Sequence, residues 1–282
     1  MDHPTGCRRG RDALLVLITA LTLPSAALAQ SINLAPSAPG EWRVGLTPYL
    51  FLPVTTTGTA TIADAEADVD LDLSDIFGAM RFAGSARAEV WRGDLGLIVD
   101  GYYANLSAGT TLSFPDAGVS TARVDLTLVQ GWVTAMGAYR ALQGSYGDAG
   151  RRYGIDAAIG FRWNSLRQEV EAAVDIDQGE DLQATLGGRE TWFEPVIGIR
   201  GGVEVSESWT LGARAELGGF GANGSDLQWN VLAGADYAPW ETVSLKIGWQ
   251  VYGIDFETER SDGTFGYNVV QTGPYLGATF RF

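Results

Sequence analysis

A period-two alternation of apolar and polar or small residues recurs along the chain, and it constrains the fold more than any other feature. In the stretch VSLKIGWQVY, every second residue from Val243 to Val251 is apolar. Successive side chains of a β-strand point to opposite faces, so this stretch predicts a strand with one apolar face. Such segments occur near residues 42–60, 78–92, 95–112, 118–142, 151–172, 190–206, 210–218, 228–237, 243–252 and 265–282.

The connections and the aromatic residues favour a membrane barrel over a soluble sheet. If the carboxyl terminus is periplasmic and each turn changes sides, the short connections share its side and the long acidic ones lie opposite. The aromatic residues then form two rims: Trp42, Trp91, Tyr139, Tyr153, Trp209, Trp240 and Phe282 on the short-turn side, and Tyr103, Phe161, Trp163, Phe193, Trp229 and Trp249 on the other. Two aromatic belts around an aliphatic band predict an antiparallel transmembrane β-barrel. About nine residues per strand, tilted by ~40°, span roughly 23 Å, which suits the apolar layer.

The amino terminus has the pattern of a cleaved export signal. Arginines at positions 8, 9 and 11 precede an apolar stretch, residues 13–23, that is too short to cross a bilayer. Ala27-Leu28-Ala29 has the small residues that signal peptidase accepts. We therefore expect a signal peptide at 1–29, a short flexible lead-in at 30–41 and the barrel at 42–282.

The carboxyl terminus, GPYLGATFRF, places Phe282 on the terminal carboxylate. The spacing Gly277-x-x-Phe280-x-Phe282 resembles the carboxyl-terminal insertion signal of Gram-negative outer-membrane barrels, which the assembly machinery reads as the final, closing strand. More broadly, residues 42–282 resemble the small porin-family outer-membrane β-barrel proteins of proteobacteria, on GGFG at 218–221, the residues that follow it as far as Trp229, and the closing strand. The resemblance implies a β-barrel in the outer membrane and no particular cargo.

An enzyme is not expected, and neither is a cofactor or a metal site. The only histidine, His3, and the only cysteine, Cys7, belong to the export signal. Without them the exported chain has no histidine base, no thiol nucleophile and no imidazole or thiolate metal ligand. The catalytic barrels that this architecture resembles, namely omptin proteases, the outer-membrane phospholipase and lipid A deacylases, rely on a histidine.

The strand count is expected to be about ten, and eight or twelve stay open because a closed bacterial barrel has an even number. In the long segment 118–142, the alternation of apolar and polar residues is lost around residues 130–135, which suggests a β-bulge. Residues 67–73 could form an extra strand or the upper part of a hairpin that extends past the membrane.

If the apolar faces contact lipid, the opposite faces line the lumen, and their charges are of both signs. The expected lumen residues are Arg43, Arg81, Arg87, Glu89, Asp100, Asp156, Arg162, Glu194, Arg200, Glu204, Arg214, Glu216, Asp236 and Lys246. A barrel of about ten strands is only slightly wider than its side chains can fill, so opposite charges should pair across it. We favour a structural or interaction barrel with a charge-paired lumen. The alternative is a narrow pore for small solutes, because inward glycines such as Gly45, Gly212 and Gly248 leave space.

Acidic residues in the connections between strands account for most of the formal net charge of −15. Three clusters contain them: Asp64, Glu66, Asp68, Asp70, Asp72 and Asp75; Asp175, Asp177, Glu180 and Asp181; and Asp255, Glu257, Glu259 and Asp262. Solvation and repulsion between barrels explain them most simply, and weak Ca²⁺ or Mg²⁺ bridges to lipopolysaccharide phosphates are the alternative. The expected partners are outer-membrane lipid and lipopolysaccharide, the barrel assembly machinery and weakly bound divalent cations, with no nucleic acid.

Overall fold

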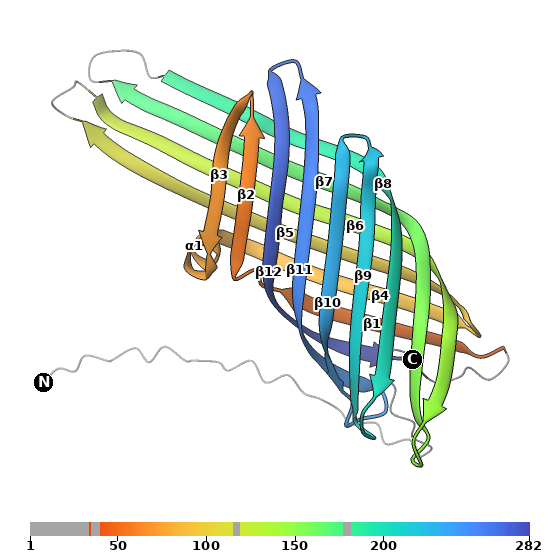
Figure 1. Ribbon diagram of the computed structural model, residues 1–282. Coiled ribbons are helices and arrows are strands. Elements are labelled where there is room, and N and C mark those ends of the chain that lie inside the picture. The colour runs from red at the N-terminus through yellow and green to blue at the C-terminus, as the bar shows by residue number, and fades with distance from the viewer. Residues whose placement is uncertain (1–33, 35–39, 115–118, 177–181) are drawn as a thin grey trace, which may run out of the picture.

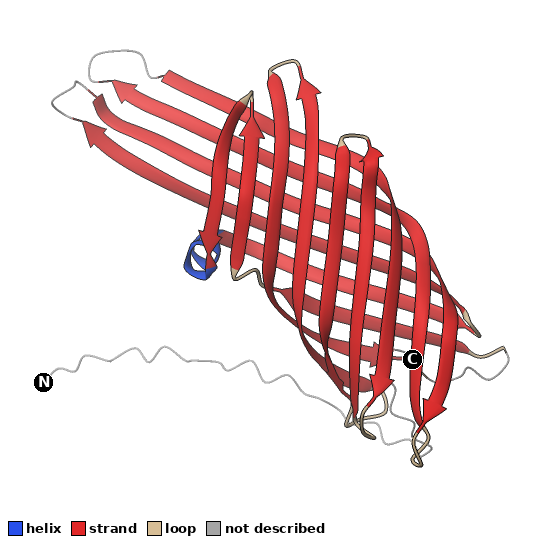
Figure 2. Cartoon of the chain, in the orientation of Figure 1, coloured by secondary structure: helices blue, strands red, loops and turns tan. Residues whose placement is uncertain are grey.

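The computed structural model describes residues 34, 40–114, 119–176 and 182–282, and its strands form one antiparallel sheet that closes on itself (Figures 1 and 2). The expected signal peptide, most of the lead-in and Asp177, Glu180 and Asp181 lie outside these residues. The elements are β1 (Trp42–Phe51), β2 (Thr55–Ile62), β3 (Ala65–Asp72), α1 (Leu73–Ala79), β4 (Met80–Arg92), β5 (Leu95–Phe114), β6 (Val119–Tyr146), β7 (Arg151–Ile176), β8 (Leu182–Glu204), β9 (Trp209–Ala222), β10 (Ser225–Tyr237), β11 (Val243–Arg260) and β12 (Gly263–Arg281).

Ten of the described strands form the ring. Each strand from β4 to β11 pairs with the next along the chain, β1 pairs with β4, and β12 pairs back onto β1. The predicted fold, a closed antiparallel barrel of about ten strands, is therefore confirmed. The β1–β12 seam runs from Gly45 opposite Arg281 to Phe51 opposite Tyr275.

The hairpin β2–β3 continues the wall of the barrel beyond this seam. Leu52 N and Val54 N still bond to carbonyls of β12, at 3.1 and 2.8 Å, and β2 then pairs with the first half of β12. The predicted strand 42–60 is thus broken at residues 52–54, where Pro53 has no N–H to donate. Of the two expectations for residues 67–73, the hairpin arm is the one observed, because β3 ends at Asp72 and pairs only with β2.

A helix of about two turns links the hairpin to the ring. Asp72 begins α1 as a capping box, with its carboxylate accepting from the backbone N–H of Ser74 and Asp75 at 2.7 and 3.0 Å. Within the described part of the chain, no helix is long and apolar enough to span a membrane.

The bulge expected near residues 130–135 is not there. Pairing of β6 is regular from Gln130 to Ala135 on both sides, and its shifts fall at Val119/Thr121 and Arg140/Leu142. The alternation of apolar and polar residues is lost for another reason. Trp132 and Met136 are large apolar residues that are buried inside the barrel, while the apolar Val133 faces outward. Both faces of β6 are apolar at this height.

The two ends of the barrel differ. The turns at 93–94, 147–150, 205–208 and 238–242 lie at the same end as Phe282, which we call the short-turn end. At the other end the strands are long: β6 has 28 residues, which at about 3.3 Å each and a ~40° tilt rise roughly 70 Å, well beyond an apolar layer of about 25 Å. Figure 1 shows β5 to β8 projecting past the rest of the ring.

The outer surface carries the apolar band and most of the predicted aromatic rims. Ile159 and Phe161 on β7 are 68% and 66% exposed. The outward rim residues are Trp42, Tyr139, Trp209, Trp240 and Phe282 at the short-turn end, and Tyr103, Phe161, Trp163, Phe193 and Trp249 toward the other. The prediction was wrong for Trp91, which is 0% exposed because it shares the inward parity of Arg87 and Glu89.

Candidate functional site in the lumen

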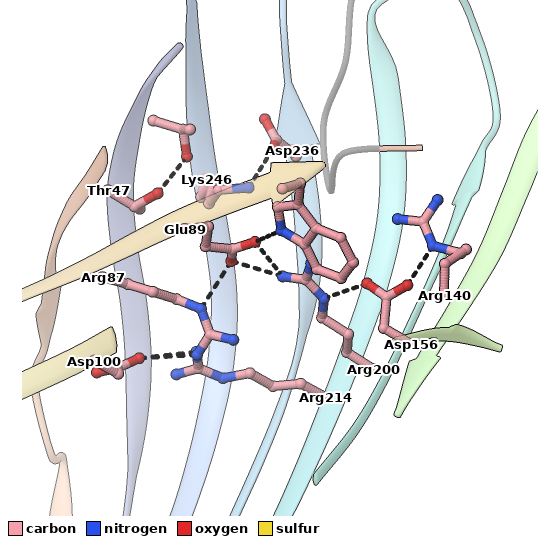
Figure 3. A network of polar contacts seen from close by, with 12 residues as sticks. Thr47, Arg87, Glu89, Asp100, Arg140, Asp156, Arg200, Arg214, Asp236 and Lys246 are labelled. Atoms are coloured by element: carbon pink, nitrogen blue, oxygen red, sulfur yellow. Dashed lines mark hydrogen bonds and ion pairs between the residues drawn. The ribbon is translucent and has the colours of Figure 1, made fainter. Parts of the chain in front are cut away.

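Charged side chains from the six strands β4 to β9 meet inside the ring and form one network, most of which Figure 3 shows. Arg87 on β4 lies at its centre: its Nε donates to Glu89 at 2.9 Å, and its Nη1 donates to Asp100 at 3.0 Å. Arg87 also lies 3.6 Å from the carboxylate of Glu216 on β9. Because β4 and β9 are opposite each other in the ring of ten, this pair crosses the lumen.

Two further arginines reach across the barrel. Arg200 on β8 donates Nη1 to both oxygens of Glu89, at 2.6 and 2.8 Å, and its Nε donates to Asp156 at 2.7 Å. Arg214 on β9 donates to Asp100 on β5 at 3.2 Å. The carboxylates are therefore shared between cations from different walls, which ties non-neighbouring strands together.

Arg162 on β7 extends the network toward the long-strand end. Its Nη2 donates to Glu216 at 2.8 Å, its Nη1 lies 3.5 Å from Glu194, and its Nε donates to Thr134 at 2.8 Å. The residue is 1% exposed. Charges this deeply buried are tolerated only when they are paired, and loss of one partner is costly.

Trp91 packs within the same network. Two guanidinium groups lie near its ring, that of Arg140 5.5 Å and that of Arg200 5.2 Å from the ring centroid, and its Nε1 donates to Glu89 at 3.0 Å. Cation–π contacts of this kind gain strength where water is excluded. The indole thus fills space between the charges and orients Glu89.

The remaining sequence-predicted lumen residues lie around this network. Asp236 pairs with Lys246, and Glu204 pairs with Arg152 at 2.5 Å near the short turns. Arg43 donates to the carbonyl of Gly93 at 3.3 Å. Arg81 is exposed and lies next to a register shift between Met80 and Phe82 in β4, away from these buried pairs.

Arg140 belongs to the network, and the sequence reasoning missed it. It is buried and pairs with Asp156. The signal was present in the sequence, because Arg140 shares the inward parity of Trp132, Met136 and Ala138, and the bulge toward Leu142 begins only after it. Leu34 was also missed, because it lies in the expected flexible lead-in: it is buried, and a Cβ on Gly154 would lie 3.0 Å from its Cδ2.

Stacked aromatic rings cross the lumen above the charges, on the long-strand side. Trp132 on β6 lies between Tyr102 and Tyr252, with ring centroids 4.1 and 4.8 Å away. Trp192 stacks on Phe256 at 3.7 Å. Since β6 and β11 are opposite in the ring, the contact between Trp132 and Tyr252 bridges the full width of the barrel. We call these five side chains the aromatic layer.

The aromatic layer is held by polar contacts as well. The hydroxyl of Tyr252 donates to the amide oxygen of Gln228 at 2.6 Å and accepts from Gln130 at 3.4 Å. Tyr49 stacks on Tyr275 at 4.8 Å and donates its hydroxyl to Asp100 at 2.6 Å, which links the aromatic side chains to the charged network. Described side chains thus fill the lumen at two successive levels.

A cavity of about 390 Å³ remains on the short-turn side of the charged network. Residues of β1, β4 and β8 to β12 line it. Its space comes from inward glycines, since Gly212, Gly234 and Gly248 occupy one continuous row of paired positions across β9, β10 and β11. A side chain at Gly234 could not fit, because its Cβ would lie 2.4 Å from the carbonyl oxygen of Ile247.

The three residues of the expected assembly signal lie on the closing strand. Gly277 faces β1 closely enough that a Cβ would lie 3.2 Å from Tyr49 Cβ. Phe280 is exposed, and Phe282 is 79% exposed while its backbone N–H donates to Val44 at 2.9 Å. The Phe282 ring therefore contributes little packing to the folded barrel.

A closed antiparallel ring with an apolar, aromatic-rimmed exterior and a charged interior defines a transmembrane β-barrel of the bacterial outer-membrane class. No protein-family model matches the sequence, and no curated protein does.

Among solved structures, the chain is similar to the outer-membrane protease OmpT from Escherichia coli, with a TM-score of 0.46 and 11% identity over 86% of this chain and 97% of that one. It is also similar to the translocator domain of the autotransporter NalP from Neisseria meningitidis, with a TM-score of 0.37 and 12% identity over 88% and 90%. Ail from Yersinia pestis gives a TM-score of 0.30 and 12% identity over 87% and 100%.

Proposed function

We propose that this protein is a structural or interaction barrel of the outer membrane whose lumen is closed, with no catalytic role. The observation that carries the proposal is the pair of cross-lumen bridges, Arg87 to Glu216 and Trp132 to Tyr252. An aqueous pore keeps its lining charges solvated on one wall, whereas here guanidinium groups reach the carboxylates of the opposite wall.

The long strands give such a barrel an interaction surface. The hairpin β2–β3 pairs with β12 above the level of the rim residue Trp249, and the upper ends of β5 to β8 project past the rest of the ring (Figure 1). Their acidic side chains, for example Asp68 and Asp70, are exposed. We expect them to lie in the lipopolysaccharide layer with weakly bound divalent cations, and we expect the assembly machinery to recognise the closing strand.

Single-channel recording in planar lipid bilayers tests the closed lumen. The full chain should give no stable conductance step above background. A matched variant in which Arg87, Arg200 and Trp132 are replaced by Ala, and which still folds by heat-modifiable gel mobility, should conduct because both levels of the filling are then weakened. A stable open step in the unmodified protein would instead favour the alternative, a narrow channel for small solutes.

A further inference from the structure

The cavity at the short-turn end is lined by more cationic than acidic groups. The cationic residues are Arg43, Arg87, Arg200, Arg214, Lys246 and Arg281, and the acidic groups are Glu41, Glu89, Asp236, Glu241 and the terminal carboxylate of Phe282. Glu41 and Glu241 are exposed. The two deeper acids already have cationic partners, since Glu89 accepts from Arg87 and Arg200, and Asp236 accepts from Lys246.

Three of the lining arginines keep a buried N–H group that has no acceptor among the described residues. These are Nη2 of Arg200, Nε of Arg214 and Nη1 of Arg281. The side chains of Arg200 and Arg214 are 10% and 9% exposed, so these donors are largely withheld from bulk water. Arg281 uses its other terminal nitrogen to donate to Ser244 Oγ at 2.8 Å. Among the lining carboxylates, one buried oxygen, Asp236 Oδ1, also lacks a partner within the described chain.

Buried donors without acceptors are costly, and a cluster of cationic ones is stabilised by an anion. Guanidinium groups present planar pairs of N–H donors that match carboxylate and phosphate oxygens. The volume of about 390 Å³ lies in the range of small-molecule sites. Inward glycines leave this space open beside the arginines.

We propose that this cavity binds a small anion with a carboxylate or phosphate group, which enters from the short-turn end. The ligand would contact Arg200, Arg214 and Arg281, while Lys246 pairs with Asp236 and offsets its charge. Binding does not depend on the closed lumen: a barrel that conducts could still hold the anion, and a silent barrel could lack the site.

Calorimetric titration of the full chain, folded in detergent micelles, tests the site. The two probes are inorganic phosphate and succinate, and choline serves as a cation of similar size. Saturable binding of at least one anion at about one per barrel, with none of choline, is the expected result. Absence of binding by both anions overturns the proposal.

Two substitutions locate the binding. Arg281→Gln removes a cavity cation that makes no ion pair within the described chain, and it should weaken binding about tenfold or more, as for a lost charge-assisted hydrogen bond. Gly45→Leu keeps every charge but fills the cavity, and a Cβ there meets nothing closer than 3.9 Å. It should abolish binding.

The matched control is Arg81→Gln, which removes an exposed arginine outside the cavity. It should leave the affinity unchanged. The anion binds elsewhere if Gly45→Leu has the same affinity as the unmodified protein. The same conclusion follows if the Arg81 and Arg281 variants lose equal amounts of affinity for the anion. Heat-modifiable gel mobility confirms that each variant is folded, and if Arg281→Gln is not, Gly45→Leu decides the question.

Discussion

Trp132 and Tyr252 stack face to face across the barrel, with ring centroids 4.8 Å apart and an interplanar angle of 11°. They come from β6 and β11, which are opposite in the ring. The contact joins two walls that share no backbone hydrogen bonds, so it contributes to the rigidity of the barrel as well as to the filling of its lumen.

Trp132→Ala should lower the free energy of unfolding by about 3–5 kcal/mol, the usual cost of removing a large buried aromatic side chain. Trp163→Ala is the control, because Trp163 lies on the adjacent strand and faces outward. Urea unfolding in lipid vesicles measures both. A smaller loss for Trp132 than for Trp163 would mean that the aromatic layer does not stabilise the barrel.

Arg162→Ala should destabilise the barrel by about 3–5 kcal/mol, because it leaves Glu194 and Glu216 without this buried partner. Arg167, five residues along the same strand, pairs with Glu169 but its side chain is 38% exposed. Replacement of Arg167 by Ala should lower the free energy of unfolding by only about 0–1 kcal/mol, because solvent screens this partly exposed pair. The same unfolding measurement compares the two, and equal losses would argue for a hydrated lumen.

The fold could be predicted from the sequence because one physical rule repeats in every strand. Lipid contacts one face of each strand and the lumen contacts the other. Apolar and polar or small residues therefore alternate in β7 and in β11, although the two strands differ in length and sequence. The rule fails where backbone regularity fails, as at Pro53, where the predicted strand 42–60 is broken. This error is local and does not change the order of the strands.

The lumen was harder to predict than the fold. A narrow barrel fills its interior with whatever fits, so inward positions hold Trp91 and Trp132 beside arginines. Apolar character therefore does not report which face is inside. Parity alone would have assigned Trp91 correctly, two residues after Glu89. Which charges pair across the ring depends on the stagger of distant strands, which spacing within one strand does not contain.

Deletion of Phe282 should impair assembly in cells without weakening the folded barrel. The ring is 79% exposed, so its loss removes little packing. We expect less heat-modifiable protein in outer-membrane fractions but unchanged refolding in detergent. Phe161→Ala, which removes an outward aromatic ring from the opposite rim, should assemble normally. Normal insertion of the truncated chain would remove the interpretation of Gly277, Phe280 and Phe282 as an assembly signal.

Asp64 should make the long-strand end sensitive to acid. It lies in the turn between β2 and β3, and its carboxylate accepts from the backbone N–H and the hydroxyl of Thr264, both at 2.8 Å. These hydrogen bonds, the backbone one first, lower the pKa of Asp64. A lowered pKa in the folded state means that the contact is fully formed above the ordinary aspartate pKa of about 3.9 and is lost as the pH falls through the lowered value.

Hydrogen exchange of the Thr264 amide measures this directly. Its protection factor should stay constant from neutral pH down to about pH 4 and then fall. Asp64→Asn should give weaker protection that no longer changes with pH, and Asn also tolerates the positive φ of 66° at this position. Asp68→Asn, in the same hairpin, should keep the pH dependence. A protection factor of the unmodified protein that stays the same down to pH 2 would show that the carboxylate of Asp64 does not join the hairpin β2–β3 to the hairpin β11–β12. A protection factor of the Asp64 variant that still falls with acid would show the same.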